Sequence, residues 1–248
     1  MTLAGKSVIV TGAATGIGRG ITECLLKAGA GITVAGRREK PLLELAERYG
    51  DAVSVVAQDV AAPGAAERIV AAAADRFGGV DAVVNNAGLA RFGDLDTIDP
   101  AQFDAMFAVN VRAPAELIRC ALPYLRAGRG SVVNISSAGG VLSMPGRAFY
   151  GATKAAVNSL TRSLAVELAP DVRVNALLPG PVLTPMWDET GLDTEGAERL
   201  RAGLLKSTPM GRFGEDGEIG RWVCLLLDSE VSGWVTGALM SVDGGRTA

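Results

Sequence analysis

Histidine is absent from the 248 residues of this chain, and its absence restricts the chemistry that the protein can perform. Histidine is the commonest acid-base residue at neutral pH and the commonest metal ligand. We therefore expect no metal site, and we expect a different side chain to move protons. Tyr150 is available for that role.

Other features are scarce rather than missing. The three cysteines, Cys24, Cys120 and Cys224, are far apart, which favours reduced thiols and a cytoplasmic location. No apolar run reaches the ~18 residues of a membrane span, and the N-terminal stretch lacks the apolar segment of a signal peptide. The net charge is −3, so we expect neither nucleic acid nor an anionic membrane as a partner.

Short β-branched segments alternate with Ala-, Leu-, Glu- and Arg-rich segments. Apolar strands alternating with helices are typical of a parallel sheet covered on both faces. We predict an α/β fold, a Rossmann-like doubly wound parallel sheet of about seven strands with helices on both faces. The expected strands are residues 7–10, 32–35, 53–57, 82–84, 132–135, 173–176 and 239–242. The expected helices are residues 17–27, 41–49, 65–77, 100–112, 115–125, 149–168, 194–205 and 215–227.

A glycine-rich segment, residues 11–18, follows the first expected strand and opens the first helix. A strand, a tight turn and a helix N-terminus form an anion site, because backbone N–H groups point at the ligand. Glycines at Gly12, Gly16 and Gly18 let a pyrophosphate approach the backbone closely. An ordinary glycine-rich turn is the alternative, and the strand-turn-helix context disfavours it.

Tyr150 and Lys154 lie one helical turn apart, and Ser137 precedes the tyrosine by thirteen residues. A free tyrosine has a pKa of about 10, which is too high for acid-base work at neutral pH. An ammonium about 4 Å away is expected to lower that pKa by up to ~3 units. A solvated surface pair is the alternative interpretation for any isolated Tyr-x-x-x-Lys sequence.

Together these motifs resemble the short-chain dehydrogenase/reductase family, in its branch of roughly 250 residues, and the resemblance covers the whole chain. The glycines are spaced Gly-x-x-x-Gly-x-Gly. Further matches are the Asn-Asn-Ala-Gly turn at residues 85–88, Asn110, the segment 134–137, the loop 179–185 and the segment 242–245. The connections are short and no Ser/Pro-rich linker appears, so we expect a single domain over residues 1–248, with a long irregular insertion at about 183–207 that we expect to be a substrate loop. The resemblance implies that this domain is dinucleotide-binding and catalytic.

The cofactor expected from the sequence is NADP(H), with NAD(H) less favoured. Many NAD-binding folds end the second strand with an acid that holds the ribose 2′-hydroxyl. Gly36 stands at that place and Arg37 follows, so a guanidinium can bind a 2′-phosphate instead. Arg37 and Arg38 could also form only a solvated loop, and Thr15 stands where NADP-preferring relatives often carry a second basic residue.

The resemblance assigns roles to particular residues. The expected catalytic residues are Asn110, Ser137, Tyr150 and Lys154. The expected cofactor-binding residues are Gly12, Thr15, Gly16, Ile17, Gly18, Arg37, Arg38, Asp59, Val60, Asn86, Ala87, Gly88, Tyr150, Lys154, Pro179, Gly180, Val182 and Thr184. Ser137 and Tyr150 would bind a carbonyl oxygen, Tyr150 would donate its proton, and Asn110 would hold a water that connects Lys154 to solvent.

The function implied is NADP(H)-dependent reduction of a ketone to a secondary alcohol, or the reverse. Leu89, Phe92, Val141, Met144, Met186 and Trp187 are the expected substrate pocket, and their side chains favour an apolar or aromatic ketone. Alternatives are a 3-oxoacyl (carrier-protein or CoA) reductase and, in another class, a non-catalytic NADP-binding sensor or scaffold. The helices at 115–125 and 149–168 have apolar residues on more than one face, so each needs a second packing partner. The resemblance implies that the partner is the same pair of helices in a second subunit, in a homotetramer or homodimer.

Overall fold

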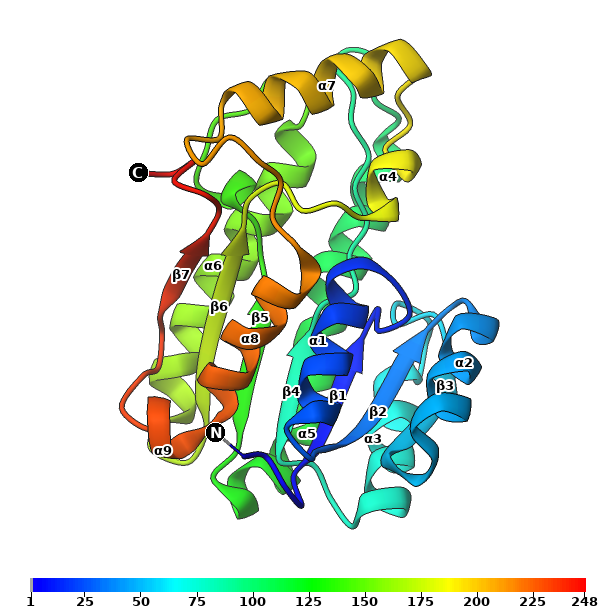
Figure 1. Ribbon diagram of the computed structural model, residues 1–248, viewed down its shortest axis with the longest axis vertical. Helices are drawn as coiled ribbons and strands as arrows, with labels where there is room; N and C mark the ends of the chain where they lie inside the picture. Colours follow the sequence, from blue (N-terminus) through cyan, green and yellow to red (C-terminus); the bar gives the residue numbers. More distant parts are fainter. Residues whose placement is uncertain (1) are drawn as a thin grey trace.

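The computed structural model describes residues 2–248, apart from the side chains of Asp188 and Glu189. Seven parallel strands form one sheet in the order β3-β2-β1-β4-β5-β6-β7 (Figure 1). Their bounds are β1 Ser7–Thr11, β2 Gly31–Gly36, β3 Val53–Ala57, β4 Ala82–Asn85, β5 Ser131–Ile135, β6 Arg173–Pro179 and β7 Leu239–Val242. The predicted doubly wound sheet is therefore confirmed.

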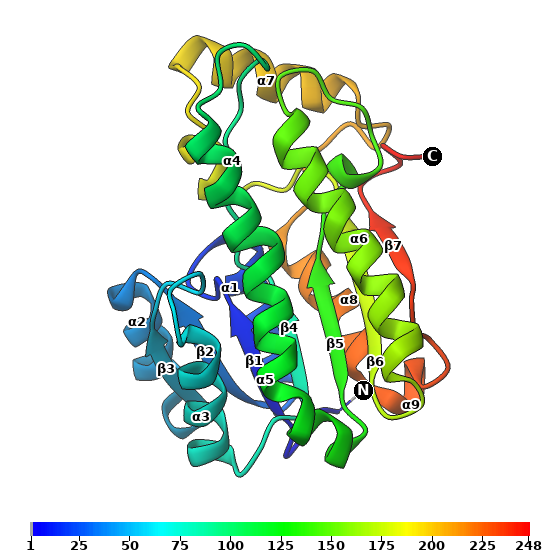
Figure 2. The same cartoon turned by 180° about the vertical axis from the view of Figure 1, so that it is seen from behind.

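Helices cover both faces of the sheet, because successive strand residues point to opposite sides. Val8 and Val10 of β1 face the core under α1, α2 and α8, whereas Ile9 faces the core under α3, α5 and α6 (Figures 1 and 2). The helices are α1 Gly16–Lys27, α2 Glu39–Tyr49, α3 Ala65–Phe77, α4 Pro100–Phe107, α5 Ala113–Gly128, α6 Ala148–Leu168, α7 Thr194–Lys206, α8 Asp216–Leu227 and α9 Ser229–Ser232.

The expected helix bounds differ from the structure in one informative place. Two separate helices were expected at residues 100–112 and 115–125, but α4 and α5 are joined by a π-helical turn at Ala108–Arg112. Such turns are rare and often occur at functional sites. The loop expected at 183–207 contains a 3₁₀ turn at Pro185–Glu189 followed by α7.

The chain order places the strand crossover at one point of the sheet. The chain passes outward from β1 through β2 to β3, and then returns to β4 on the other side of β1. Ligands in open α/β sheets bind outside the carboxyl ends of the strands at such a point. Among the residues described, no helix combines the length and the apolar character needed to cross a bilayer.

Candidate active site

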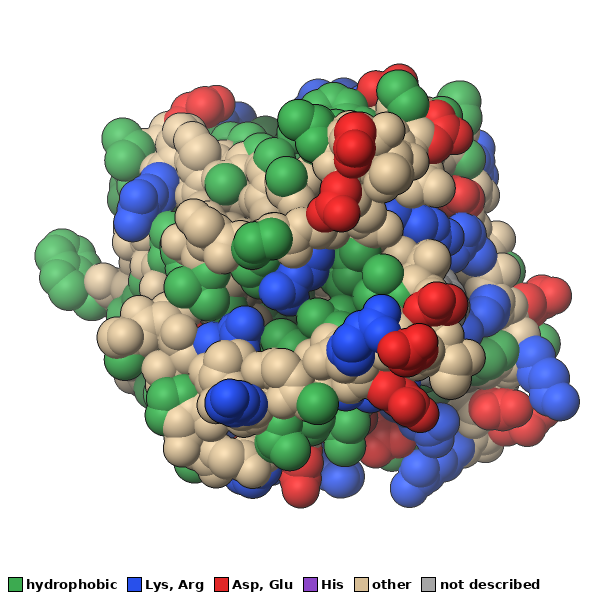
Figure 3. Space-filling model, turned by 90° about the horizontal axis from the view of Figure 1, so that it is seen from above, with side chains coloured by type: hydrophobic (Ala, Val, Ile, Leu, Met, Phe, Trp, Pro, Cys, Tyr) green, Lys and Arg blue, Asp and Glu red, His purple; other side chains and the backbone are tan. Residues whose placement is uncertain are grey.

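A cavity of about 260 Å³ opens at the carboxyl ends of the strands, beside the crossover between β1 and β4. Hydrophobic side chains and Lys or Arg side chains surround a hollow on this face of the molecule (Figure 3). All eighteen residues expected to bind the cofactor line the cavity. The structure therefore brings together segments that run from Gly12 to Thr184.

The glycine-rich loop is shaped by close contacts. Gly12 and Gly16 have φ angles of +63° and +52°, in the left-handed region that favours glycine. A Cβ on Gly18 would lie 2.0 Å from the Gly12 carbonyl oxygen. Substitution of these glycines would therefore strain the turn or separate α1 from β1.

The N-terminus of α1 is suited to an anion. Thr15 is the N-cap residue, but its side chain makes no capping hydrogen bond, and the first turn contains no acid. The first backbone N–H groups of a helix lack partners within the helix and carry the positive end of its dipole. The Thr15 hydroxyl instead accepts a hydrogen bond of 2.8 Å from Nη2 of Arg38.

The ends of β2 and β3 complete this side of the cavity. Gly36 ends β2, and the exposed Arg37 and Arg38 follow it, so no acid stands at the end of this strand. Asp59 follows β3 and lines the cavity, and its Oδ1 atom accepts a 2.9 Å hydrogen bond from the Ala61 N–H. Asp59 thus caps its own turn, which is the structural alternative to a role in adenine binding.

Asn86 fixes the glycine-rich loop to the neighbouring strand. Its Nδ2 atom donates to the carbonyls of Thr11 and Gly12 at 2.9 and 3.1 Å. The Thr11 hydroxyl accepts from the N–H groups of Asn86 and Ala87, both at 3.0 Å. The Asn-Asn-Ala-Gly turn therefore holds β1 and β4 in register at the floor of the cavity.

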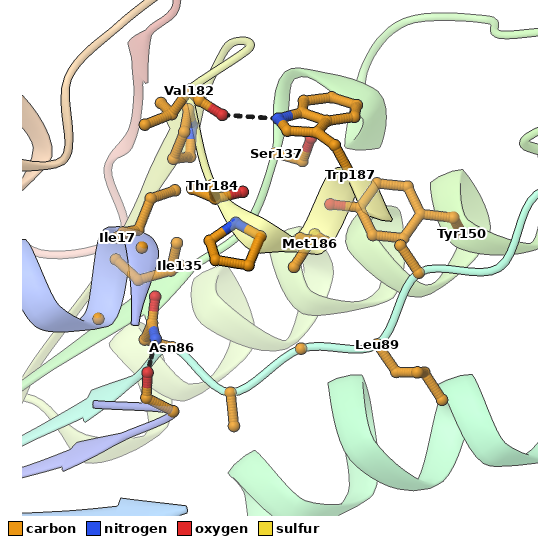
Figure 4. A pocket seen from close by; sticks show the side chains of 18 of the residues that line it. Ile17, Asn86, Leu89, Ile135, Ser137, Tyr150, Val182, Thr184, Met186 and Trp187 are labelled. Atoms are coloured by element: carbon orange, nitrogen blue, oxygen red, sulfur yellow. Dashed lines mark hydrogen bonds between the residues drawn. The ribbon is translucent and has the colours of Figure 1, made fainter. Parts of the chain in front are cut away.

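Ser137 and Tyr150 lie on the other side of the cavity (Figure 4), which Lys154 also lines. Ser137 follows β5 and begins a 3₁₀ turn, accepting from the Gly139 N–H at 3.0 Å. Tyr150 and Lys154 lie in the first two turns of α6, with the Lys154 Nζ atom 5.8 Å from the centre of the tyrosine ring. Ser136 has a different role, since its hydroxyl donates to Oδ1 of Asn158 at 2.7 Å.

The pKa values of this cluster differ from those expected. Burial raises the pKa of Tyr150, although a hydrogen bond from Ser137 and the charge of Arg147 lower it. Lys154 was expected to lower the pKa of Tyr150, but its Nζ atom donates to the Ile135 carbonyl at 2.9 Å. Burial also lowers the pKa of Lys154 to about 8. In this structure Tyr150 is consequently a protonated phenol at neutral pH, the form that can donate a proton.

Asn110 lies in the π-helical turn, and it does not appear among the residues that line the cavity. Its Nδ2 atom donates to the Leu89 carbonyl and to the Thr153 hydroxyl, both at 2.9 Å, and its Oδ1 atom accepts from the Leu89 N–H at 2.8 Å. Both amide donors are therefore engaged, so the side chain cannot donate to the water that was expected there. Asn110 instead connects the loop after β4 to the helix that carries Tyr150.

Five of the six residues expected in the substrate pocket line the cavity: Leu89, Phe92, Met144, Met186 and Trp187. The sixth, Val141, was assigned wrongly. It follows the 3₁₀ turn at Ala138–Gly140, which directs it to solvent, and it is 55% exposed. Phe92 packs edge-on against Tyr150 with the ring centres 5.8 Å apart. Trp187 is fixed by a 2.7 Å hydrogen bond from Nε1 to the Val182 carbonyl.

Several cavity residues were missed by sequence analysis. They include Arg147 before α6, Thr190 after the 3₁₀ turn, Leu204 on α7 and Arg246 after β7. None of them belongs to a recognisable motif. The only available signal was their position near segments that end at the same edge of the sheet.

Comparison with known proteins agrees with this geometry. Residues 12–247 match the family model described as enoyl-(acyl carrier protein) reductase. The chain is 35% identical to the 3-oxoacyl-[acyl-carrier-protein] reductase FabG of Thermotoga maritima, over 99% of both chains. The chain belongs to the short-chain dehydrogenase/reductase family.

Other members of this family have different substrates. The chain is 35% identical to the L-fucose dehydrogenase of Mus musculus, over 97% of this chain and 88% of that protein. A 3-ketoacyl-(acyl-carrier-protein) reductase from Brucella melitensis, crystallised with NADH, is 31% identical and superimposes over the whole of both chains with a TM-score of 0.91. The protein is thus an oxidoreductase of the short-chain type.

Proposed function

We propose that the protein is an NADP(H)-dependent reductase of ketones, with the reverse oxidation of secondary alcohols available at the same site. The observation that supports this most strongly is the cluster of Ser137, Tyr150 and Lys154 in the cavity that begins at the N-terminus of α1. We also propose that residues 1–248 act as one dinucleotide-binding and catalytic domain, with a substrate loop at about 183–207.

The residues present fit a nicotinamide dinucleotide. The uncapped amides of α1 would hold the pyrophosphate, and the absence of Cβ atoms at Gly12 and Gly16 leaves the loop backbone accessible. Asp59 and Val60 would contact the adenine end, and Lys154 would reach the ribose near Tyr150. When bound, the nicotinamide ring supplies or accepts the hydride.

The side chains of the cluster can handle the proton. We propose that the Ser137 hydroxyl and the Tyr150 phenol donate to the substrate oxygen, and that the Tyr150 proton transfers to this oxygen as negative charge develops there. The phenolate that remains is stabilised by the Ser137 hydroxyl and by the charge of Arg147. The role proposed for Asn110 is positioning, because it connects the Leu89 backbone to Thr153 on α6.

The preference for NADP(H) over NAD(H) is supported by the end of β2. Arg37 and Arg38 lie at the cavity beside Gly36, and Arg38 is held by Thr15 next to the N-terminus of α1. A guanidinium at this place would attract a 2′-phosphate, whereas a carboxylate would repel it. The Brucella melitensis relative was crystallised with NADH, so NAD(H) is the alternative cofactor.

For the substrate, we propose a ketone with an apolar or aromatic body, supported by Phe92, Met144, Met186 and Trp187 around the cavity. A 3-oxoacyl reductase is the second candidate, favoured by the FabG relative. Arg126 and Arg129 are basic residues that an acidic carrier protein could contact. They lie at the C-terminal end of α5, just before β5 begins, and therefore at the opposite edge of the sheet from the cavity.

We also propose a homodimer or homotetramer in the cytoplasm. Val166 of α6 is 83% exposed and Tyr124 of α5 is 39% exposed, as expected for helices that pack against a second subunit. The three cysteines are free, which suits a reducing compartment. Light scattering at micromolar concentration should report a dimer or tetramer, and a stable monomer would contradict the assembly.

The test of the function is oxidation of NADPH, with NADH in parallel, against a panel of aliphatic, aromatic and 3-oxoacyl ketones. We expect NADPH-dependent turnover of at least one class. Absence of turnover with every ketone and with the corresponding alcohols, although the cofactor binds, would favour a non-catalytic sensor.

A further inference from the structure

Two arginines from segments far apart in the chain line the substrate side of the same cavity. Arg147 is the N-cap residue of α6, three residues before Tyr150, and Arg246 lies in the turn after β7. Both side chains are partly buried. The mutual repulsion of the two guanidinium groups contributes, after burial, to lowering the pKa of Arg147.

No acidic side chain among the described residues pairs with either guanidinium in an ion pair. Arg246 donates to neutral acceptors, the Ser207 hydroxyl and the Leu204 carbonyl. The nearest acid in sequence, Asp243, uses its carboxylate within its own turn, accepting from the N–H groups of Gly245 and Thr247, both at 2.9 Å.

Two like charges in a partly buried cavity are unfavourable unless an anion offsets them. The N-terminus of α1 would bind the cofactor pyrophosphate, and Arg37 and Arg38 lie at the end of β2, where a 2′-phosphate would bind. Arg147 and Arg246 come from different segments, which adjoin Tyr150 and α7. The cofactor phosphates therefore do not account for this pair of charges.

We infer that the substrate carries an anionic group on the same molecule as its carbonyl, and that Arg147 and Arg246 bind this group. The inference rests on the proposed ketone reduction and specifies its substrate class. Arginine suits this task because its planar fork forms charge-assisted hydrogen bonds with carboxylates and phosphates.

The geometry favours a short oxo acid. The Arg147 guanidinium carbon lies 5.8 Å from the centre of the Phe92 ring, and that centre lies 5.8 Å from the centre of the Tyr150 ring. The sum of these two distances is an upper limit on the distance between the Arg147 guanidinium and the Tyr150 ring. These distances place the anion and the reacting carbonyl within one small molecule, whose carbon chain the apolar walls at Phe92 and Met144 would contact.

The test compares matched charged and neutral ketones. The substrates are 3-oxobutanoate, 4-oxopentanoate and 5-oxohexanoate, each against its methyl ester, and hydroxyacetone phosphate against hydroxyacetone. We expect kcat/KM with NADPH to favour the best acid over its ester by about 10- to 150-fold, the range that one charge-assisted hydrogen bond supplies. Preference for the phosphate over the carboxylates would identify the anion as a phosphate ester.

Variants of the arginines connect this preference to the site. In Arg147→Gln and Arg246→Gln, the ratio of acid to ester should fall toward one, whereas Arg147→Lys should retain part of it because the charge remains. Arg126→Gln, which removes an exposed arginine of α5 outside the cavity, should leave the ratio unchanged. The ratio cancels any effect of Arg147 on the pKa of Tyr150, because both substrates experience that effect equally.

Calorimetric titration of 4-oxopentanoate and its methyl ester into the protein with bound NADP⁺ provides a readout that needs no turnover. Tighter binding of the acid in the wild type, lost in Arg147→Gln, would support the inference. Equal binding and equal kcat/KM for acids, phosphates and neutral ketones would overturn it while leaving ketone reduction intact. Failure of every ketone to turn over, together with selective binding of the acid, would overturn the proposed reaction and retain the anion site.

Discussion

The two ends of the cavity are built in different ways. At the dinucleotide end the surface is mostly backbone: the glycine-rich loop, the uncapped amides of α1 and the turn after β4. At the substrate end the surface consists of side chains from segments far apart in the chain, including Phe92, Met144, Trp187 and Arg246. A ligand site made of backbone needs glycines at fixed spacings. A ligand site made of side chains can change its specificity through a substitution at a single residue.

This contrast explains how one fold serves different substrates. The relatives named above share the framework but act on a 3-oxoacyl carrier protein or on L-fucose, according to their names. The glycine loop cannot vary without a clash, because a Cβ on Gly18 would lie 2.0 Å from the Gly12 oxygen. The loop that carries Trp187 has no comparable restriction.

The largest effect is expected from Tyr150→Phe, which should impair turnover at the substrate end and leave binding at the dinucleotide end intact. Loss of the phenol hydroxyl removes the proton that Tyr150 would donate to the substrate oxygen. This should lower kcat by the 10²- to 10⁴-fold typical of lost acid-base catalysis. Binding of NADPH, followed by its fluorescence, should change little. Tyr124→Phe, at an exposed tyrosine of α5, is the matched control. Near wild-type turnover in Tyr150→Phe would show that the tyrosine is not the acid.

The next effect concerns the cofactor. One charge-assisted bond to a 2′-phosphate should favour NADPH over NADH by about 10- to 150-fold, and exposure of Arg37 should place the value near the low end. Changing Gly36→Asp together with Arg37→Gln should reverse the kcat/KM ratio. The control Lys40→Gln removes an exposed positive charge of α2 outside the cavity, and it should leave the kcat/KM ratio unchanged. A ratio unmoved by the double change would mean that the arginines form only a solvated loop.

A smaller effect should appear in the pH dependence of stability. The pKa of Lys154 is about 8 in the folded protein, below its ordinary value of 10.5, so the unfolded state binds more protons between these values. The free energy of unfolding should therefore rise with pH, by about 2 kcal/mol between pH 7.5 and 9.5. This contribution is lost as the pH falls through 8.

Urea denaturation of the cofactor-free protein across this range would measure the effect. Lys154→Met should remove the slope that the lysine contributes, and Lys27→Met, at an exposed lysine of α1, should retain it. An identical pH dependence in wild type and Lys154→Met would mean that Lys154 keeps an ordinary pKa in the folded protein.

The smallest effect is expected at Val141. This side chain is 55% exposed and lies outside the cavity, whereas the neighbouring Met144 lines it. Val141→Ala should therefore leave KM for the best ketone within about twofold, and Met144→Ala should raise it by several-fold through lost apolar contact. Equal changes in the two variants would show that the 3₁₀ turn rearranges when substrate binds.

The sheet, its helices and the glycine-rich end of the cavity could be predicted from the sequence, for a physical reason. Strands buried on both faces must be apolar along their length, and a tight turn under a helix N-terminus must have glycine at particular positions. These demands are local in sequence, as at Gly12, Gly16 and Gly18. They can therefore be recognised before the chain is folded.

The remaining features depend on contacts between distant segments. Arg147 and Arg246 line the same cavity only after α6 and β7 are in place, so neither could be recognised from its neighbours in the sequence. The pKa of Tyr150 depends on burial, on the hydrogen bond from Ser137 and on the charge of Arg147, none of which helical spacing determines. The engagement of Asn110 with Leu89 and Thr153 likewise required the folded geometry.

The central claim is that the cavity at the N-terminus of α1 binds a nicotinamide dinucleotide, with NADPH preferred. Calorimetric titration of NADPH and NADH into the wild-type protein without substrate tests it most directly. We expect saturable binding of both, with NADPH tighter by about tenfold or more at low salt and the difference decreasing as salt is added. Absence of binding by either dinucleotide, or tighter binding of NADH at every salt concentration, would contradict the account.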